Sequence, residues 1–198
     1  LGLADIIQNT AGAVSLETMF VDEGFGSLDD QSRERAIRIL KELAGEKGLV
    51  GIISHVNELT GLMGRWQQLS DAPLLICDTG HNIGGITYIT QQIKSIPYHH
   101  LHIVIGMVND KDIRGVLSLL PQEASYYFTK ASVKRALPEG ELQSIANEFG
   151  LKGTTYPSVE SAVRAAQEKS LPKDFIFVGG SSFIVADLLA SRNALNLN

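Results

Sequence analysis

The chain has 198 residues, 44% hydrophobic and 20% charged, which is ordinary for a water-soluble globular protein with a sizeable core. Its net charge is −5, and neither residues 1–56 (five basic against nine acidic) nor the remainder (twelve against thirteen) has the basic excess that binds nucleic-acid backbones. Nucleic-acid binding by this chain alone is therefore disfavoured. No apolar run approaches the roughly 18 residues of a membrane span. The single cysteine, Cys77, cannot form an internal disulfide and favours a reducing, cytoplasmic compartment.

Apolar runs alternate along the chain with segments of helical periodicity, which predicts βαβ units in a three-layer α/β sandwich with a mostly parallel sheet. We expect strands at 18–22, 49–54, 73–77, 101–106, 125–129 and 174–178. We expect helices at 30–44, 83–95, 112–120, 139–149, 158–169 and 181–190. The segment 57–64 is typical of a connection, which predicts two domains, residues 1–56 and 57–198. Because the sequence begins at Leu1 rather than Met, we expect a piece of a longer protein.

Two adjacent acids, Asp22 and Glu23, follow the first predicted strand. An acid at the carboxyl end of a strand can hold Mg²⁺, usually through water, and Glu23 could polarise an attacking water. His55 follows the second predicted strand and could contact a γ-phosphate. The simpler interpretation of an isolated Asp-Glu pair is a solvated turn.

The order of these residues resembles the C-terminal ATPase lobe of the SbcC/Rad50 family, which are ABC-type ATPases that process DNA ends. The matching elements are the helix start Leu1-Gly2-Leu3-Ala4-Asp5-Ile6-Ile7, the Walker B pair Asp22-Glu23, the D-loop Gly26-Ser27-Leu28-Asp29 and the switch histidine His55. The resemblance covers residues 1–56. It implies ATP as ligand, Mg²⁺ at Asp22, and catalytic roles for Glu23 and His55. The 198 residues contain no G-x-x-x-x-G-K-[ST] loop to hold phosphates, so we expect an inactive half-site.

A second group of polar residues lies beyond residue 63. It consists of Gly64-Arg65, Asp78-Thr79-Gly80-His81-Asn82, Asn109-Asp110-Lys111-Asp112 and Ser181. Each has a structural interpretation. Asp78 and Asn82 could form turns after a strand, Asp110 or Asp112 could cap a helix, and Ser181 could cap the last helix. The cluster His99, His100 and His102 raises the question of zinc, but surface histidines are the simpler interpretation.

From residue 57 to about 190 the chain resembles the C-terminal domain of the Mur ligase superfamily, with its Rossmann-like sheet, and above all folylpolyglutamate synthase/dihydrofolate synthase. Asp78-Thr79-Gly80-His81-Asn82 stands where the family has Asp-Gly-Ala-His-Asn, and Gly106-Met107-Val108-Asn109-Asp110-Lys111-Asp112 and Val178-Gly179-Gly180-Ser181-Ser182 match later blocks. The chain departs from the common pattern at Thr79 and at Ile83, where proline is frequent.

The resemblance implies ATP-dependent joining of a folate or pteroate carboxylate to L-glutamate through an acyl phosphate. It implies that Arg65 reaches ATP phosphate and that Asp78 bonds ribose hydroxyls or orients the incoming ammonium. It further implies that His81 and Asn82 line the cleft beside ATP or glutamate. Ser181 would offer its hydroxyl and amide to a glutamate carboxylate, and Lys111 would support the cleft electrostatically.

Three interpretations therefore stand side by side. The first is the C-terminal domain of a folate:L-glutamate ligase joined to an SbcC-like segment. The second is a fragment of an SbcC/Rad50-type DNA-repair ATPase, and the third is a non-catalytic scaffold recombined or engineered from two folds. In the first, the P-loop and most of the folate pocket belong to an N-terminal ATPase domain that these residues do not contain, so catalysis by them alone is not expected. A lobe without its partner should expose apolar surface and self-associate.

Overall fold

The structure, a computed structural model, describes residues 18–22, 49–53, 64–109 and 112–197. The chain divides into two compact units, Leu1–Val56 and Asn57–Asn198. In the first unit, strands β1 (Thr18–Asp22) and β2 (Leu49–Ile53) pair in parallel, with Asp22 opposite Ile53. Both strands lie where the sequence predicts them. The expected helix at 30–44, Glu23 and His55 fall outside the described residues.

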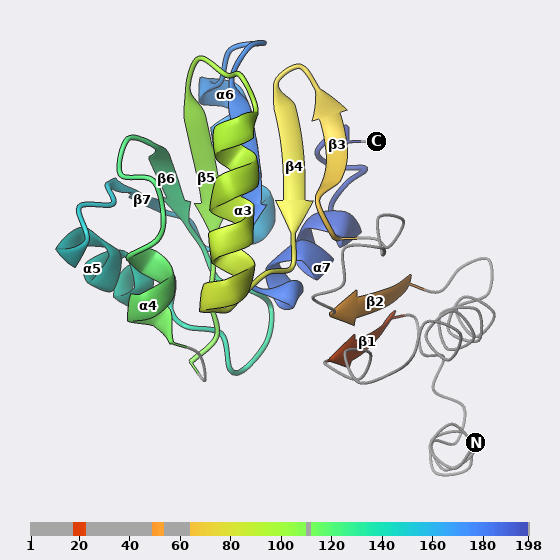
Figure 1. Cartoon of the computed structure of the whole chain (residues 1–198). Coiled ribbons are helices and arrows are strands. Elements are labelled where there is room, and N and C mark those ends of the chain that lie inside the picture. Colours follow the sequence, from red (N-terminus) through yellow and green to blue (C-terminus); the bar gives the residue numbers. More distant parts are fainter. Residues whose placement is uncertain (1–17, 23–48, 54–63, 110–111, 198) are drawn as a thin grey trace, which may run out of the picture. The chain divides into compact units, whose positions relative to one another are not determined.

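The second unit is built on a six-stranded sheet with the order β3-β4-β8-β5-β6-β7 (Figure 1). Its strands are β3 (Gln67–Asp71), β4 (Leu74–Asp78), β5 (Leu101–Ile105), β6 (Ser125–Phe128), β7 (Gly153–Thr155) and β8 (Phe175–Gly179). All neighbours pair in parallel except β3, which runs antiparallel to β4. The prediction of a mostly parallel sheet is confirmed.

In the described part of this unit, five helices accompany the sheet: α3 (Ile83–Ser95), α4 (Ile113–Leu117), α5 (Glu139–Glu148), α6 (Val159–Lys169) and α7 (Ser182–Ala190). Four of them begin at a side chain that accepts a backbone N–H of the first turn, which is the usual stabilisation of a helix start. The capping residues are Asn82, Asp112, Ser158 and Ser181.

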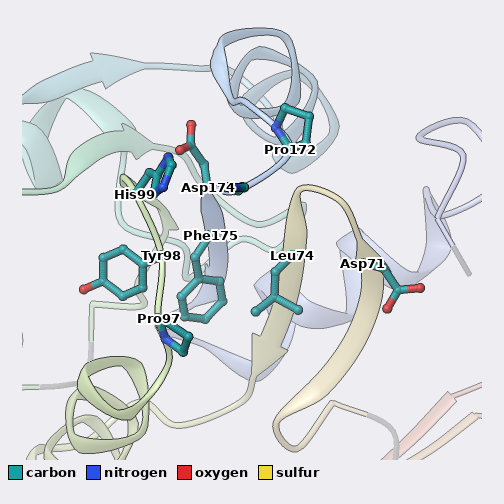
Figure 2. Close-up of a pocket in the computed structure, with 9 residues that line it drawn as sticks. Asp71, Leu74, Pro97, Tyr98, His99, Pro172, Asp174 and Phe175 are labelled. Carbon is teal, nitrogen blue, oxygen red and sulfur yellow. The ribbon is translucent and has the colours of Figure 1, made fainter.

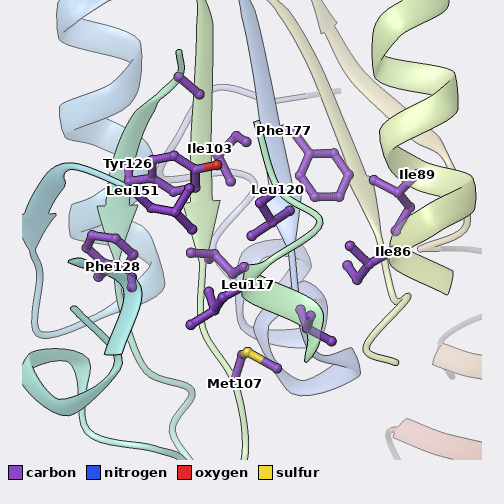
Figure 3. Close-up of a cluster of buried hydrophobic side chains, with 14 of the residues drawn as sticks. Ile86, Ile89, Ile103, Met107, Leu117, Leu120, Tyr126, Phe128, Leu151 and Phe177 are labelled. Atoms are coloured by element: carbon purple, nitrogen blue, oxygen red, sulfur yellow. The ribbon is translucent and has the colours of Figure 1, made fainter. Parts of the chain in front are cut away.

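Alternate residues of the strands pack on opposite faces of the sheet, because side-chain direction in a strand has a period of two. In β5, Ile103 and Ile105 belong to the apolar cluster shared with α3, α4 and α5, part of which Figure 3 shows. Val104 between them belongs to the cluster shared with α6 and α7. Helices thus cover both faces, and the expected three-layer α/β sandwich is confirmed.

Two strands, β3 and β7, are absent from the sequence prediction. The residues of β3 are Gln67-Gln68-Leu69-Ser70-Asp71, a mostly polar sequence tolerated because this strand lies at the sheet edge. Strand β7, with three residues, is too short to show a period. Helix α4 ends at Leu117, before the predicted residue 120. In the part of the chain that the structure describes, no helix is long and apolar enough to cross a membrane.

Candidate functional site

The candidate site lies at the carboxyl edge of the sheet, where α/β folds place their ligands. Asp78, the last residue of β4, is opposite Gly179, the last residue of β8. Gly179 is also opposite Ile105 of β5, and the Gly106 amide donates to the Gly179 carbonyl at 3.3 Å. The carboxyl ends of β4, β8 and β5 are therefore adjacent. Asp78 ends β4, and the segment that leads to Ser181 follows the neighbouring strand β8.

A tight turn holds Arg65 at this edge. The Gly64 carbonyl accepts the Thr79 amide at 2.9 Å, and the Trp66 amide donates to Asp78 Oδ2 at 2.8 Å. Gly64 and Trp66 have φ values of 87° and 40°, and the strain at a tryptophan is tolerated because its ring packs against Phe177 at 6.3 Å. These contacts position Arg65 beside the end of β4.

Asp78 is buried, with 5% of its surface exposed. Its Oδ1 accepts the Gly80 amide at 2.7 Å, so each carboxylate oxygen accepts one backbone N–H. Burial raises the pKa of Asp78, and the two amides together with the positive charge of Arg65 counteract part of that rise. Each oxygen keeps a further lone pair for a donor from a ligand.

Arg65 is the clearest sign of a binding function. Its Nε and Nη2 atoms are buried and have no hydrogen-bond partner among the residues that the structure describes, and the same holds for the Oγ1 of neighbouring Thr79. Unpaired buried donors destabilise a fold by about 1–3 kcal/mol each, and more when the group is charged. A guanidinium left in this state suits an anion with several oxygens, such as a phosphate.

His81 and Asn82 continue the segment after Asp78. His81 is 7% exposed, and its Nδ1 lies 3.1 Å from the Thr79 carbonyl. Because a carbonyl can only accept, Nδ1 carries the proton and Nε2 of the neutral ring is an acceptor. Asn82 Oδ1 accepts the Gly85 amide at 2.8 Å and caps α3. The sequence predicted a turn former at Asn82, and the structure shows that this residue is the N-cap of α3.

Ser181 is the N-cap of α7 and its Oγ accepts the Phe183 amide at 3.2 Å. It is 2% exposed, and its hydroxyl hydrogen remains to be donated. Gly180 before it has a φ of 92°, so the backbone turns sharply from β8 into the helix. The capping interpretation is confirmed, and the same geometry leaves Ser181 at the carboxyl edge.

The remaining predicted residues are only partly placed. Lys111 and Asp110 lie outside the described residues, while Asp112 caps α4 by accepting the Gly115 amide at 2.9 Å. Asp22 is placed by its backbone alone, at the carboxyl end of β1. The described residues contain no group of three or more His, Cys, Asp or Glu side chains able to hold a metal ion.

Sequence reasoning missed one polar residue at this edge, Thr129. It follows β6 directly, is fully buried, and its Oγ1 has no hydrogen-bond partner in the described ranges of the chain. Its position in the sequence could have indicated this, because Thr129 directly follows an apolar strand, just as Thr79 directly follows the strand that ends at Asp78. Sequence also placed His102 at the surface. In fact it is 3% exposed and bonds Tyr127 and Asp174, because it faces the layer of α6 and α7.

The fold and this edge define a three-layer α/β domain with a polar, partly unsatisfied rim at the carboxyl ends of its parallel strands. Known sequences show which family builds such a domain. A sequence profile described as Mur ligase, glutamate ligase domain, matches residues 64–182, and the chain belongs to this family.

Solved structures of folate ligases are similar to the second unit. Escherichia coli FolC in complex with ADP has 30% sequence identity and a TM-score of 0.63, covering 68% of this chain and 32% of that one. The bifunctional folylpolyglutamate synthase/dihydrofolate synthase of Yersinia pestis, complexed with AMPPNP and Mn ion, has 30% identity and a TM-score of 0.61, covering 71% and 33%. The chain thus spans about a third of these enzymes.

A second set of relatives consists of SbcC proteins, the C component of the SbcCD nuclease. The protein of Treponema pallidum is 54% identical over 59 residues, and that of Lactococcus lactis 46% identical over 65 residues. These matches cover 30% and 33% of this chain but only 6% of either relative. The predicted composite of an SbcC-like part and a Mur ligase C-terminal domain is confirmed.

Proposed function

We propose that residues 57–198 are the C-terminal domain of an ATP-dependent folate:L-glutamate ligase and contribute part of its ATP and glutamate site. The observation that carries this proposal is the pair of buried Arg65 nitrogen atoms, without a partner in the described part of the chain, beside the oriented carboxylate of Asp78. The likeness to a FolC structure that contains ADP supports it.

In this proposal each residue acts through the atoms that the fold leaves available. Arg65 binds ATP phosphate through its unpaired donors and neutralises charge as the folate carboxylate is phosphorylated. Asp78 accepts ribose hydroxyls or the ammonium of glutamate through its remaining lone pairs. His81 presents Nε2 as an acceptor, and Asn82 follows it in the same segment, beside ATP or glutamate.

The glutamate end of the site uses the start of α7. Ser181 donates its hydroxyl hydrogen to a carboxylate of L-glutamate, which the positive end of the helix dipole also favours. Lys111, which lies outside the described residues, would support this site electrostatically, as the family resemblance implies. The glutamate amine then attacks the activated carboxylate of the folate or pteroate.

A separate N-terminal ATPase domain is required for the complete reaction. The 198 residues have no G-x-x-x-x-G-K-[ST] loop, and the described residues have no cluster that would hold Mg²⁺. We therefore expect no ligase activity from this chain alone, and activity only with a partner that supplies the P-loop, the Mg²⁺ ligands and the folate pocket.

The alternative function is that of an SbcC/Rad50-type ATPase fragment. The identity of 54% over 59 residues favours it for the N-terminal part. It would use Asp22 to hold Mg²⁺, Glu23 to polarise water and His55 to contact the γ-phosphate. The third alternative is a non-catalytic scaffold in which neither site binds nucleotide.

Thermal unfolding with and without saturating Mg-ATP distinguishes these functions. The chain should be compared with Asp78→Ala, with Asp22→Ala, and with Asp71→Ala as a control at an exposed position of β3. Each variant is judged by the shift relative to its own ligand-free midpoint, since Asp78→Ala also removes two backbone contacts. A ligand at a hundredfold excess over Kd stabilises the native state by about 2.7 kcal/mol.

We expect a shift in the parent chain, Asp71→Ala and Asp22→Ala that is lost in Asp78→Ala. Loss in Asp22→Ala alone would instead support the ATPase fragment. The absence of any shift in the parent chain would support the scaffold and refute a nucleotide site.

A further inference from the structure

A cavity of about 440 Å³ opens at the amino-terminal edge of the sheet, opposite the candidate ligase site (Figure 2). Leu74, which begins β4, lines it, whereas Asp78 at the other end of β4 belongs to the ligase site. The two residues are four steps apart along an extended strand, a distance of about 13 Å. The cavity falls within the range of about 300–1,000 Å³ that is typical of small-ligand sites.

Asp174 lines the cavity, and hydrogen bonds fix its carboxylate. It is 5% exposed, and its Oδ2 accepts the Leu171 amide at 2.8 Å and faces His102 Nε2 at 3.3 Å. His102 Nδ1 lies 3.0 Å from the Tyr127 hydroxyl, so the tyrosine donates to Nδ1 and Nε2–H donates to Asp174. These bonds leave Asp174 Oδ1 without a hydrogen bond from any residue that the structure describes.

Burial alone would raise the pKa of Asp174, but the bonds from Leu171 and His102 lower it by more. The carboxylate is therefore ionised at neutral pH.

Apolar side chains make up most of the lining of the cavity. Tyr98 packs against Phe175 with a ring separation of 5.9 Å, and Pro97, Pro172 and Leu74 complete the apolar lining. Figure 2 shows Asp174 and His99 together above Phe175 and Tyr98. Planar rings and prolines accept a flat aromatic body, and the electron-rich face of a tyrosine favours a cation.

The charges at the rim fit the same kind of ligand. Asp71 and Asp174 each carry a negative charge, against one positive charge at Lys173. The Asp and Lys side chains of the lining thus carry a formal charge of −1. A compact aromatic cation complements both the charge and the apolar walls.

We propose that this cavity binds a planar aromatic cation, in which an amidinium or ammonium group pairs with Asp174 and the ring packs against Tyr98. The site is independent of the ligase proposal, because it uses none of the residues at the carboxyl edge.

Benzamidine is a suitable probe, and benzamide is its neutral control of nearly the same shape. Both would be titrated into the ¹⁵N-labelled 198-residue chain at pH 7.5 up to about 10 mM, which saturates a site with a Kd of about 1 mM. We expect benzamidine to shift the amide signals of Tyr98, His99, Lys173 and Asp174. Benzamide should bind at least about tenfold more weakly, since it lacks the charge-assisted bond.

Variants test the assignment of the carboxylate. Asp174→Asn should weaken benzamidine at least about tenfold. Lys173→Ala, which removes the opposing charge, should tighten binding, and Glu160→Gln on the exposed surface of α6 should leave it unchanged. Lys173→Ala keeps the test decisive if Asp174→Asn fails to fold. Equal binding of benzamidine and benzamide, shifts confined to the carboxyl edge, or no shift at all would overturn the proposal.

Discussion

Two buried carboxylates, at opposite ends of the strands of one sheet, show how local hydrogen bonds set the pKa of a single residue. Asp78 follows Cys77 at the end of β4, and burial raises its pKa despite two backbone N–H donors and the nearby Arg65. Asp174 precedes β8, and bonds from Leu171 and His102 outweigh burial, so its pKa is lowered. The same carboxyl group thus has a raised pKa at one position and a lowered pKa at the other, because the hydrogen bonds around it differ.

Gly180 illustrates a residue whose lack of a side chain the site requires. Its φ is 92°, and a Cβ at this position would lie 2.8 Å from the Gly106 carbonyl oxygen. We expect Gly180→Ala to lower the free energy of unfolding by about 1–3 kcal/mol, because it combines a disfavoured backbone conformation with a backbone clash.

Urea denaturation would measure this effect. Gly140→Ala is the matched control, since a Cβ there meets nothing within 4 Å and the residue lies in α5. That variant should be neutral or more stable by up to about 1 kcal/mol. Similar losses in both variants would show that the turn before Ser181 is not strained.

At the scale of elements, the helices are positioned by their first residues as much as by their apolar faces. Asn82 and Ser181 begin α3 and α7 directly after the strands that carry the candidate site, so the caps also fix the site segments. Helix α6 has a reciprocal cap in which Ser158 and Ser161 each accept the backbone N–H of the other. This helix packs on the face of the sheet that includes Val104 and Tyr127.

Removing that cap gives a prediction for a single element. We expect Ser158→Ala to reduce the free energy of unfolding by about 1 kcal/mol, because the Ser161 amide loses its acceptor. Ser144→Ala in α5 is the control, since its hydroxyl only bonds the Gly140 carbonyl within the helix and alanine has the higher helix propensity. Chemical denaturation showing an equal loss in both variants would contradict the capping role.

At the scale of the molecule, the buried network of His102, Asp174 and Tyr127 ties together β5, β6 and the start of β8. Burial lowers the pKa of His102 from its ordinary 6.5, and the bond to Asp174 and its charge counteract part of that change, while the charges of His100 and Lys169 add to it. The pKa of Asp174 is also lowered from 3.8. The unfolded chain therefore takes up protons at these groups before the folded chain does.

Because both pKa values are lower in the folded state, stability is complete above pH 6.5 and falls as the solution becomes more acidic, first through His102 and then below pH 3.8 through Asp174. The slope for one proton is at most about 1.4 kcal/mol per pH unit. Urea midpoints measured between pH 8 and pH 5 should show this decline. His102→Gln should flatten it, whereas His99→Gln, at an exposed position, should not; a flat parent profile would contradict this interpretation.

The association of whole molecules can also be tested. Ile83 and Tyr88 of α3 are 48% and 49% exposed, and Leu119 beyond α4 is 37% exposed, which leaves apolar surface uncovered. We expect the isolated chain to self-associate reversibly as its concentration rises. Light scattering across a concentration series would show a rising mean mass, and a constant monomer mass would refute the prediction.

Much of the fold follows from the sequence because its strands are buried on both faces. Runs such as Phe175-Ile176-Phe177-Val178 have no polar residue to suggest another structure, and helix α3 has the predicted bounds. The likeness to Mur ligases and SbcC is also evident from motifs that are contiguous in the chain. Strands β3 and β7 could not be predicted, since one is polar and the other has three residues.

The sequence by itself determined the class of fold, the composite character and the residues to be considered. Tertiary structure alone decided which of them interact. Arg65 lies beside Asp78 because the residues on either side of it, Gly64 and Trp66, adopt positive φ values, and the Trp66 amide bonds the Asp78 carboxylate. These bonded residues are twelve positions apart in the chain, and no local sequence pattern predicts such a contact. Likewise, His102 meets Asp174 across seventy-two residues only because β5 and β8 are neighbours in the sheet. The hydrophobic periodicity of the sequence indicates which residues of one helix or strand are buried. The composition of a site depends instead on which helices and strands pack side by side.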